Sequence, residues 1–279
     1  MAIPTAQNME IRTENLYKSF GDKSVLRDLN LDVQRGQMIA VIGGSGGGKT
    51  TLLKLLTAQE KPDRGRALVA DHETPGSPLI DVAKANERQL DRLRRHWAVV
   101  FQGNALFSGT VYDNLAFVLR DVREMDEVSI RARIERAIQS VELDVKQDLQ
   151  LDVENLSGGM AKRVAIARAL VLDPILIFYD EPTSGLDPIL TTEIHELIRA
   201  VHLRRPDGNI ARTSIIVTHD RDLLQRLQPR IIMLHEGRIF FDGNYNTLSH
   251  SESPVLRPYY EFMPVLQQRK PIPPLNVPA

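Results

Sequence analysis

The 279-residue chain contains no cysteine, which excludes disulfide bonds, thiolate metal sites and cysteine nucleophiles and fits a reducing compartment. Long apolar runs are also missing: none exceeds five residues, whereas a membrane-spanning helix needs about 20. Residues 1–10 do not show the basic-then-apolar order of a signal peptide. The net charge of −1 provides no general attraction to nucleic acid or to anionic lipid. We therefore expect no nucleic-acid partner, and any role at a membrane should be peripheral.

What the chain does contain is the composition of an ordinary globular protein, with 42% hydrophobic and 25% charged residues. Short apolar runs, which predict buried strands, recur at 38–42, 97–101, 175–179, 215–217 and 231–234. Amphipathic helical patterns lie between several of these runs. Strands separated by helices predict an α/β fold with a mostly parallel sheet that is covered on both faces.

Three segments depart from this alternation. Residues 8–35 alternate polar and apolar around a turn at Phe20-Gly21-Asp22, which predicts a small antiparallel sheet. Residues 103–156 carry two helical patterns and then an acidic run, and they predict a helical subdomain inserted between the α/β halves. The C-terminal end is rich in proline, with seven of the sixteen prolines in its last 26 residues. Such a segment is either a disordered end or an arm that docks on a partner.

One glycine-rich stretch carries the strongest chemical signal. Gly43-Gly44-Ser45-Gly46-Gly47-Gly48-Lys49-Thr50 fits the phosphate-loop pattern G-x-x-x-x-G-K-[ST]. Its glycines let backbone N–H groups approach phosphate oxygens, and the following helix adds the positive end of its dipole. Lys49 would reach the β- and γ-phosphates, and the Thr50 hydroxyl would ligate Mg²⁺. A flexible glycine loop is the alternative, but it does not explain the apolar strand before the loop and the helical pattern after it. We infer a nucleoside triphosphate site.

Phosphoryl transfer also needs a carboxylate near Mg²⁺ and a group that orients or deprotonates water. Asp180 and Glu181 follow the apolar run 175–179 and supply both. His219 ends another predicted strand, so it would face the same crevice at the carboxyl ends of the strands. On chemistry alone, however, a lone histidine is more often structural, and a lone aromatic such as Phe20 is more often a core residue.

Further motifs resemble those of the ATP-binding cassette (ABC) ATPases over residues 10–245. The matching stretches stand in the order of that family: Phe101-Gln102 resembles its Q-loop, Leu156-Ser157-Gly158-Gly159-Met160 its signature, Tyr179-Asp180-Glu181-Pro182 its Walker B end, Ser184-Gly185-Leu186-Asp187 its D-loop and Thr218-His219-Asp220 its switch histidine. Phe20 stands where the family places an aromatic ring against adenine. The resemblance therefore favours functional roles for His219 and Phe20.

The resemblance implies a RecA-like P-loop core at 8–102 and 157–248, including the antiparallel β subdomain, with a helical signature subdomain at 103–156 and an extension at 249–279. It implies ATP and Mg²⁺ as cofactors. The implied catalytic residues are Lys49, Gln102, Glu181 and His219. The implied ATP-binding residues are Phe20, Gly43, Gly44, Ser45, Gly46, Gly47, Gly48, Lys49, Thr50, Thr51, Ser157, Gly158 and Gly159, and the magnesium ligands are Thr50, Gln102 and Asp180.

In this family the signature of one cassette faces the phosphate loop of another. Because the chain has one of each, the resemblance implies a head-to-tail homodimer around two ATP molecules. Ser157-Gly158-Gly159 opens a predicted helix and would offer N–H groups to the γ-phosphate of the neighbour. Gln102 would sense Mg²⁺ and lead to the cleft that receives a coupling helix of a membrane permease.

A finer resemblance is to the ATPases of maintenance-of-lipid-asymmetry (Mla) systems, which drive phospholipid movement between the two membranes of Gram-negative bacteria. It rests on the stretch 156–169, on Met160 where most ABC ATPases have glutamine, and on the C-terminal arm that starts at 251–256. In that family the arm crosses to the neighbouring subunit. The resemblance implies a permease, a lipid-binding MCE protein and a small STAS-domain protein as partners, at the cytoplasmic face of the inner membrane.

Three other readings stay open from the sequence. The chain could be the ATPase of a nutrient importer, which only Met160 and the arm argue against. A soluble ABC protein acting on nucleic acid or ribosomes would be expected to show basic patches, two cassettes or a long coiled coil. A binding module without hydrolysis is disfavoured because Lys49, Asp180, Glu181 and His219 are all present.

Overall fold

The computed structural model describes residues 8–74, 76–123, 125–203 and 211–265. Its first sheet has four strands in the order β2-β1-β4-β5, and all neighbours are antiparallel. The strands are β1 (Met9–Phe20), β2 (Lys23–Gln34), β4 (Arg64–Val69) and β5 (Ile80–Asp81). The antiparallel sheet expected for 8–35 is therefore present, and the segment after the first helix adds two strands to it.

The second sheet has six strands in the order β10-β9-β3-β8-β7-β6. They are β3 (Met38–Gly43), β6 (Trp97–Val100), β7 (Leu176–Asp180), β8 (Thr213–Val217), β9 (Arg230–His235) and β10 (Arg238–Gly243). Only β10 runs antiparallel, against β9, while the other neighbouring strands are parallel. The expected mostly parallel sheet is thus confirmed, with a hairpin added at one edge.

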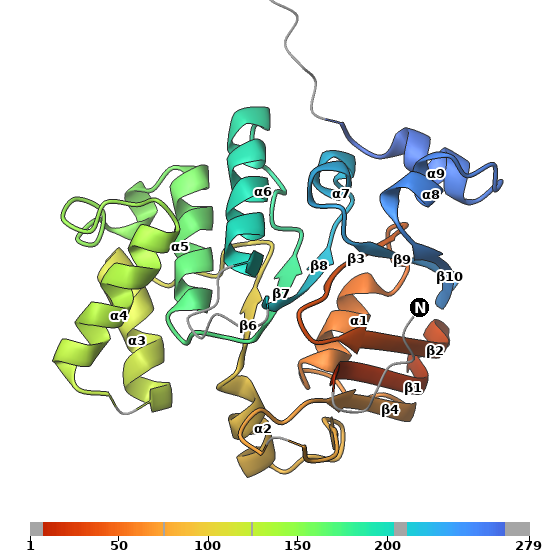
Figure 1. The fold of residues 1–279 in the computed structure, drawn as a ribbon, viewed down its shortest axis with the longest axis horizontal. Coiled ribbons are helices and arrows are strands. Elements are labelled where there is room, and N and C mark those ends of the chain that lie inside the picture. Colours follow the sequence, from red (N-terminus) through yellow and green to blue (C-terminus); the bar gives the residue numbers. More distant parts are fainter. Residues whose placement is uncertain (1–7, 75, 124, 204–210, 266–279) are drawn as a thin grey trace, which may run out of the picture.

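The structure describes nine α-helices along the chain. They are α1 (Lys49–Leu56), α2 (Glu87–Arg94), α3 (Val111–Arg123), α4 (Glu127–Ser140), α5 (Gly158–Leu170), α6 (Pro188–Leu203), α7 (Arg221–Leu227), α8 (Tyr245–Ser249) and α9 (Leu256–Phe262). Of these, α5, α6 and α7 lie beside this sheet (Figure 1). Helices α3 and α4 lie within the segment expected to be helical, and α5 packs against both.

Strand β7 shows why both faces of the sheet are buried. Its successive side chains point to opposite faces, and all four residues from Leu176 to Tyr179 are buried. Ile177 and Tyr179 join the core under helices α3 to α7, whereas Leu176 and Phe178 join a second core with α1, α2 and the antiparallel sheet. Helix α1 is therefore enclosed between the two sheets, and the phosphate loop before it is fixed from both sides.

The parallel register brings the candidate site together at one edge of the sheet. Val41 of β3 and Asp180 of β7 both lie beside Val217 of β8, and Val100 of β6 lies beside Tyr179. The segments that follow these strands therefore leave the sheet on the same side. They are the phosphate loop, the Q-loop, the acidic pair and the turn that holds His219.

The start of the C-terminal extension packs on its own chain. Leu256 and Met263 are buried in the core, and α8 and α9 lie together at the upper right of Figure 1. In this structure the described part of the predicted arm, up to residue 265, packs on its own chain, and its crossing to a neighbour stays a prediction. Residues 266–279, with Pro271, Pro273 and Pro274, lie outside the described residues. Among the described residues, no helix is long and apolar enough to cross a membrane.

Candidate functional site

The phosphate loop connects β3 to α1. Two of its glycines lie so close to neighbouring segments that a side chain would not fit there. Gly43 ends β3 with φ 147°, and a Cβ there would lie 2.4 Å from the carbonyl oxygen of Leu234. Gly48 caps α1 with φ 95°, and a Cβ there would lie 2.6 Å from a methyl group of Leu26. Any other residue at these two positions would distort the loop. Thr50 and Thr51 follow in the first turn of α1.

Lys49 lies folded over this loop. Its Nζ atom donates to the carbonyl oxygens of Gly43 at 2.8 Å and Gly44 at 3.2 Å. Burial lowers the pKa of the Lys49 ammonium, and the nearby carboxylates of Glu181 and Asp180 partly oppose that shift. An ammonium with weak hydration and only carbonyl partners would gain strongly from phosphate oxygens, which carry full negative charge.

Asp180 and Glu181 differ in environment although they are adjacent. Burial, together with the charge of Glu181, raises the pKa of Asp180, and Lys49 opposes this. Glu181 has φ 48°, a conformation that costs energy for a residue with a side chain, and its N–H is held by the carbonyl of Val217 at 2.9 Å. This geometry aims the Glu181 carboxylate at His219, whose Nδ1 lies 2.7 Å from its Oε2. The structure therefore brings together the predicted acidic pair and the predicted histidine.

The donor set at this edge fits Mg²⁺. A hydroxyl (Thr50), a carboxylate (Asp180) and an amide (Gln102) are oxygen ligands of the kind Mg²⁺ takes, together with phosphate and water. No cluster of three or more His, Cys, Asp or Glu side chains able to hold a metal occurs among the described residues. A site with few protein ligands suits a cation that arrives bound to nucleotide, and Mg²⁺ there would offset the cost of the Asp180 charge.

Phe20 lies on the side where a nucleotide base would project. It is 47% exposed. Together with Lys23, Val25 and residues 46–51 of the loop and α1, it lines a cavity of about 260 Å³. The ammonium of Lys18 lies 5.0 Å from the centre of its ring. Because its ring is exposed, Phe20 is unlike a core residue, and the structure favours a role in ligand binding over a role in core packing. Its contact with adenine stays a prediction.

Two cations of α5, the buried Lys162 and the partly buried Arg168, hold the Q-loop and the residues after it, and sequence reasoning missed both. Lys162, which is 1% exposed, donates to the carbonyl of Gln102 at 3.0 Å. Arg168 donates to the carbonyls of Ala105 at 2.7 Å and Asn104 at 3.1 Å. Burial lowers the pKa of both groups. The Gln102 side chain donates to Ser184 Oγ at 3.2 Å, so the Q-loop is tied to the segment after Glu181 as well.

Asp220 forms a second group that the sequence did not single out. Its carboxylate accepts from the Thr183 hydroxyl at 3.0 Å and the Leu223 N–H at 3.0 Å, and lies 2.9 Å from Nε2 of the fully buried His195. Burial raises the pKa of Asp220, but the hydrogen bonds from His195, Leu223 and Thr183 outweigh it and leave the pKa below its ordinary value. Because Asp220 follows His219 and Thr183 follows the acidic pair, this group fixes His219 relative to Glu181.

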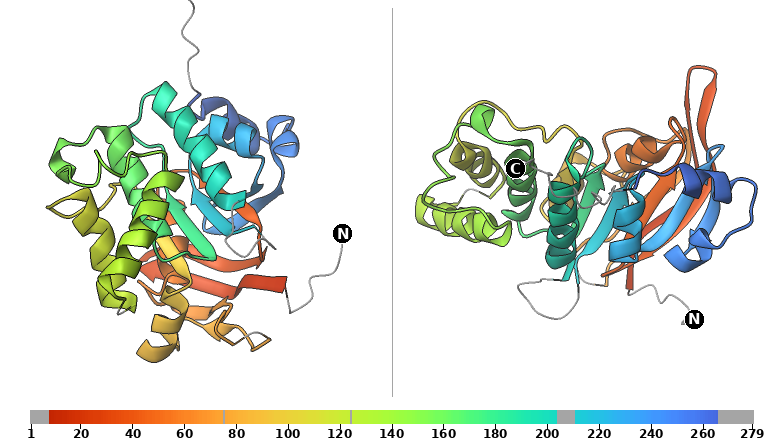
Figure 2. Two further views of the ribbon diagram at one scale, coloured as in Figure 1. Left: turned by 60° about the vertical axis from the view of Figure 1, so that its left-hand side comes forward. Right: turned by 90° about the horizontal axis from the view of Figure 1, so that it is seen from above.

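The predicted signature residues are not near the phosphate loop of their own chain. Ser157 caps α5, its Oγ accepting the Met160 N–H at 3.3 Å, and Ser157 and Gly158 are exposed. In both figures of the fold, α5 lies with α3 and α4, on the opposite side of the sheet from α1 (Figures 1 and 2). An exposed N-terminus of a helix offers free N–H groups to an anion. In this chain that anion cannot be one held by its own phosphate loop.

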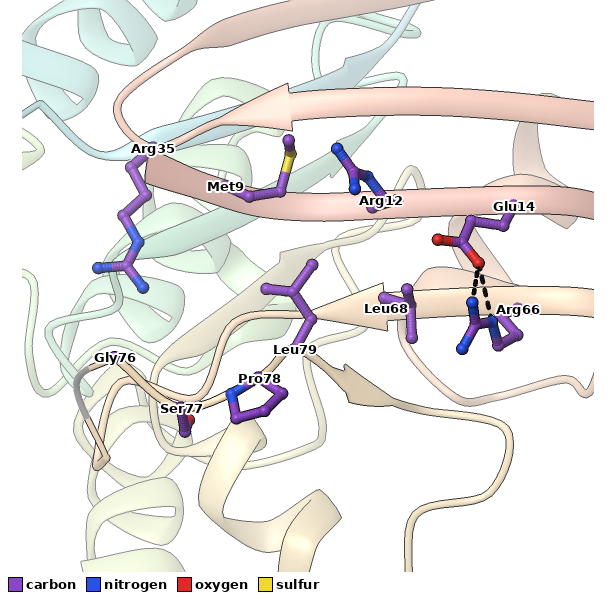
Figure 3. Close-up of a pocket in the computed structure, with 10 residues that line it drawn as sticks. All are labelled: Met9, Arg12, Glu14, Arg35, Arg66, Leu68, Gly76, Ser77, Pro78 and Leu79. Carbon is purple, nitrogen blue, oxygen red and sulfur yellow. Dashed lines mark hydrogen bonds and ion pairs between the residues drawn. The ribbon is translucent and has the colours of Figure 1, made fainter. Parts of the chain in front are cut away.

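A larger cavity of about 780 Å³ lies on the antiparallel sheet, away from the phosphate loop (Figure 3). Its floor is apolar, with Met9, Leu68 and Leu79, and three arginines surround it. Each arginine already faces a carboxylate: Arg12 with Asp32 at 2.8 Å, Arg66 with Glu14, and Arg35 with Glu10 at 3.8 Å. These neutralised arginines make the cavity a poor phosphate site, which leaves the edge of the parallel sheet as the candidate.

Comparisons with known proteins find relatives that align with most of the chain. The model of the ABC transporter family matches residues 26–184. The chain is 35% identical to the protein TRIGALACTOSYLDIACYLGLYCEROL 3 of Arabidopsis thaliana over 262 residues, covering 89% of this chain and 72% of the relative. It is 36% identical to the histidine transport ATP-binding protein HisP of Pseudomonas aeruginosa over 236 residues, covering 84% of this chain and 90% of the relative.

Solved structures show the same fold. The structure of cbiO1 from Clostridium perfringens, part of the ABC transporter complex cbiONQ, has a TM-score of 0.73 at 30% identity and covers 86% of this chain and 90% of that one. The ATP-binding cassette MJ0796, a dimer in a post-hydrolysis state bound to ADP and Pi, has a TM-score of 0.71 at 28% identity and covers 84% and 98%. The RecA-like α/β class expected from the sequence is confirmed.

The Asp220 group generates a pH-dependent prediction. Because its folded-state pKa lies below the unfolded value of about 3.9, the charge of Asp220 stabilises the fold at higher pH, and this stabilisation is lost as the pH falls through the folded value. Asp220→Asn should lower the free energy of unfolding by about 1–3 kcal/mol at pH 7, the usual loss for bonds to a charged group. The difference from wild type should begin to shrink near pH 4 and should disappear only below the folded-state pKa.

Urea unfolding at several pH values measures this difference. The matched control is Glu252→Gln, which neutralises an exposed carboxylate and should leave stability unchanged at every pH. A difference for Asp220→Asn that stays constant from pH 7 to pH 3 would contradict a role for its charge.

Proposed function

The chain belongs to the ABC transporter family and is an ATP-hydrolysing cassette that uses Mg-ATP, and we propose that it drives phospholipid movement between membranes through a separate permease. The observation that carries the lipid assignment is the relationship to TRIGALACTOSYLDIACYLGLYCEROL 3, whose name refers to a diacylglycerol lipid and which aligns over 89% of this chain. The Met160 signature and the C-terminal extension support the same branch. Relatives named for histidine or methionine transport are as similar, so a nutrient importer is the competing function.

The hydrolytic roles follow from the geometry of the site. Glu181 lies with one carboxylate oxygen 2.7 Å from His219 and borders an open pocket of about 710 Å³ with Lys49 and the first loop residues. In this role Glu181 takes the proton of the attacking water, and His219 holds that carboxylate in place. Lys49 leaves its carbonyl partners for the β- and γ-phosphates. When bound, Mg²⁺ neutralises phosphate charge, with Thr50, Asp180 and Gln102 as its protein contacts.

The separation of α5 from α1 supports a head-to-tail dimer. A second copy in a head-to-tail arrangement would place its Ser157–Gly159 against the phosphate loop of the first, and the similar cassette MJ0796 is also a dimer. Each of the two sites would then take its loop from one chain and its signature from the other. Met160 cannot make the hydrogen bonds of a glutamine amide, so one polar contact across this interface would be missing.

An exposed aromatic group next to the Q-loop is the proposed contact with the permease. Phe101 precedes Gln102 and is 38% exposed, and Phe107 and Phe117 are 39% and 52% exposed with their rings 5.3 Å apart. Aromatic side chains are favoured at protein interfaces because they bury a large area. A membrane subunit that binds here would be linked to the nucleotide through Gln102. The proposed location is the cytoplasmic face of the bacterial inner membrane.

Removal of the proposed base should separate binding from hydrolysis. Glu181→Gln keeps the size of the side chain but cannot accept the proton of water, so ATP turnover should fall at least about 100-fold, the usual scale of general-base loss. Nucleotide binding, measured with a fluorescent ATP analogue, should stay within a small factor of wild type. Near-normal turnover by this variant would rule out the proposed role of Glu181.

Mixing two inactive variants tests the dimer. Ser157→Arg blocks the signature but leaves the phosphate loop, and Lys49→Ala does the opposite. If the two motifs meet between subunits, the mixture forms one intact site for each mixed dimer, and trapped ATP should appear that neither variant traps alone. Mixed dimers that form without trapping ATP would contradict an arrangement in trans.

The substrate class is tested by isolating the assembly. Gentle-detergent purification of the tagged chain from its native membranes should yield a permease, an MCE lipid-binding protein and a small STAS-domain protein. Phe107→Asp, which charges the aromatic group, should lose the permease while still binding ATP. A permease with an amino-acid-binding protein would overturn the lipid assignment and support the nutrient importer, and a preparation without membrane proteins would overturn transport.

A further inference from the structure

A tyrosine of the C-terminal extension contacts the phosphate loop directly. The Tyr259 hydroxyl accepts the Gly43 N–H at 2.9 Å and donates to the Gly43 carbonyl at 3.1 Å. The two residues are 216 positions apart in the sequence. Burial raises the pKa of Tyr259, so its hydroxyl stays protonated at neutral pH and can fill both roles. Both polar groups of the first loop glycine are therefore held by one side chain.

The Gly43 carbonyl is shared between Tyr259 and Lys49. The Lys49 ammonium donates to the same oxygen at 2.8 Å. A carbonyl oxygen has two lone pairs, so it can accept both hydrogen bonds. When Lys49 turns to a nucleotide, it leaves this oxygen. Without the tyrosine hydroxyl, a half-buried carbonyl would then lose its side-chain partners, which costs free energy. With the hydroxyl in place, the loop keeps one partner throughout the exchange.

Helix α9 is anchored well enough to hold this contact. Leu256 and Met263 are buried, and the Tyr260 hydroxyl lies 2.9 Å from that of Tyr245. The guanidinium of Arg221 lies 4.9 Å from the centre of the Tyr260 ring, and the Arg221 N–H donates to the Pro264 carbonyl at 3.4 Å. Arg221 begins α7, two residues after His219. The extension therefore contacts the chain at the phosphate loop and close to the histidine of the site.

We propose that Tyr259 is a positioning residue for nucleotide binding, which holds Gly43 so that Lys49 can leave the loop carbonyls for the phosphates. This inference depends on the phosphate-binding role proposed above for residues 43–50. It assigns to the extension a part in ATP affinity that is separate from any contact with another subunit. Because the Tyr259 hydroxyl is bonded to Gly43 and not to Glu181 or His219, its effect should fall on binding and not on the chemical step.

The test compares Tyr259→Phe with wild type in the full chain. The variant keeps the ring and loses only the hydroxyl. The Kd for ATP and the KM of hydrolysis should rise about fivefold, the effect of one lost hydrogen bond, while kcat stays within about twofold. The matched control is Tyr260→Phe, which removes a hydroxyl from the same helix that contacts Tyr245 and not the loop. It should change the Kd and KM far less than Tyr259→Phe does, because the buried Leu256 and Met263 still anchor the helix.

Melting temperatures of both variants show whether the fold is retained. A Tyr259→Phe protein with wild-type Kd and KM would overturn the proposal, and so would one that binds ATP more tightly, since the contact would then compete with nucleotide. An equal loss of affinity in Tyr260→Phe would also overturn it, because the effect would belong to the helix as a whole. Failure of the wild-type chain to bind ATP would instead overturn the role of the phosphate loop.

Discussion

The parallel pairing of β3, β8 and β7 is the constraint on which the candidate site depends. The carboxyl ends of parallel strands lie at one edge of the sheet. Because Val41 and Asp180 pair with Val217 from either side, the loops that follow these three strands lie next to one another. The phosphate loop, the acidic pair and His219 are far apart in sequence and become neighbours for this reason. A shift of β8 by one residue would turn its buried side chains to the opposite face and would separate Glu181 from His219.

Around this edge, a set of buried and partly buried polar residues fixes loops that have no regular structure of their own. Lys162 and Arg168 hold the Q-loop carbonyls from α5, and Asp220 holds Thr183 and His195 together behind the acidic pair. Tyr259 does the same for Gly43 from the extension. Buried charges and hydroxyls of this kind are expensive to leave unpaired, so each selects one loop position. The conformation of these loops is therefore held by side chains that lie outside the loops themselves.

The chain has two helix N-termini, those of α1 and α5, that could each hold an anion but lie too far apart to hold the same one. The start of α1 lies in the phosphate loop, whereas the start of α5 lies with the helical layer on the other side of the sheet. Each end keeps its N–H groups accessible. This separation is the physical reason to expect that the complete site is formed by two copies.

Much of this could be predicted from the sequence by itself. The phosphate loop, the buried strands and the acidic pair follow from local pattern, because strand burial, glycine spacing and adjacent carboxylates are properties of short segments. The role of Phe20 needed the resemblance to a family, since a single aromatic is compatible with a core or a surface, and the structure shows it exposed. Only the tertiary structure decided that Lys162, Asp220 and Tyr259 hold the loops of the site. The residues that they hold lie between 25 and 216 positions away, and no local pattern of a lysine, an aspartate or a tyrosine reports a contact at that distance.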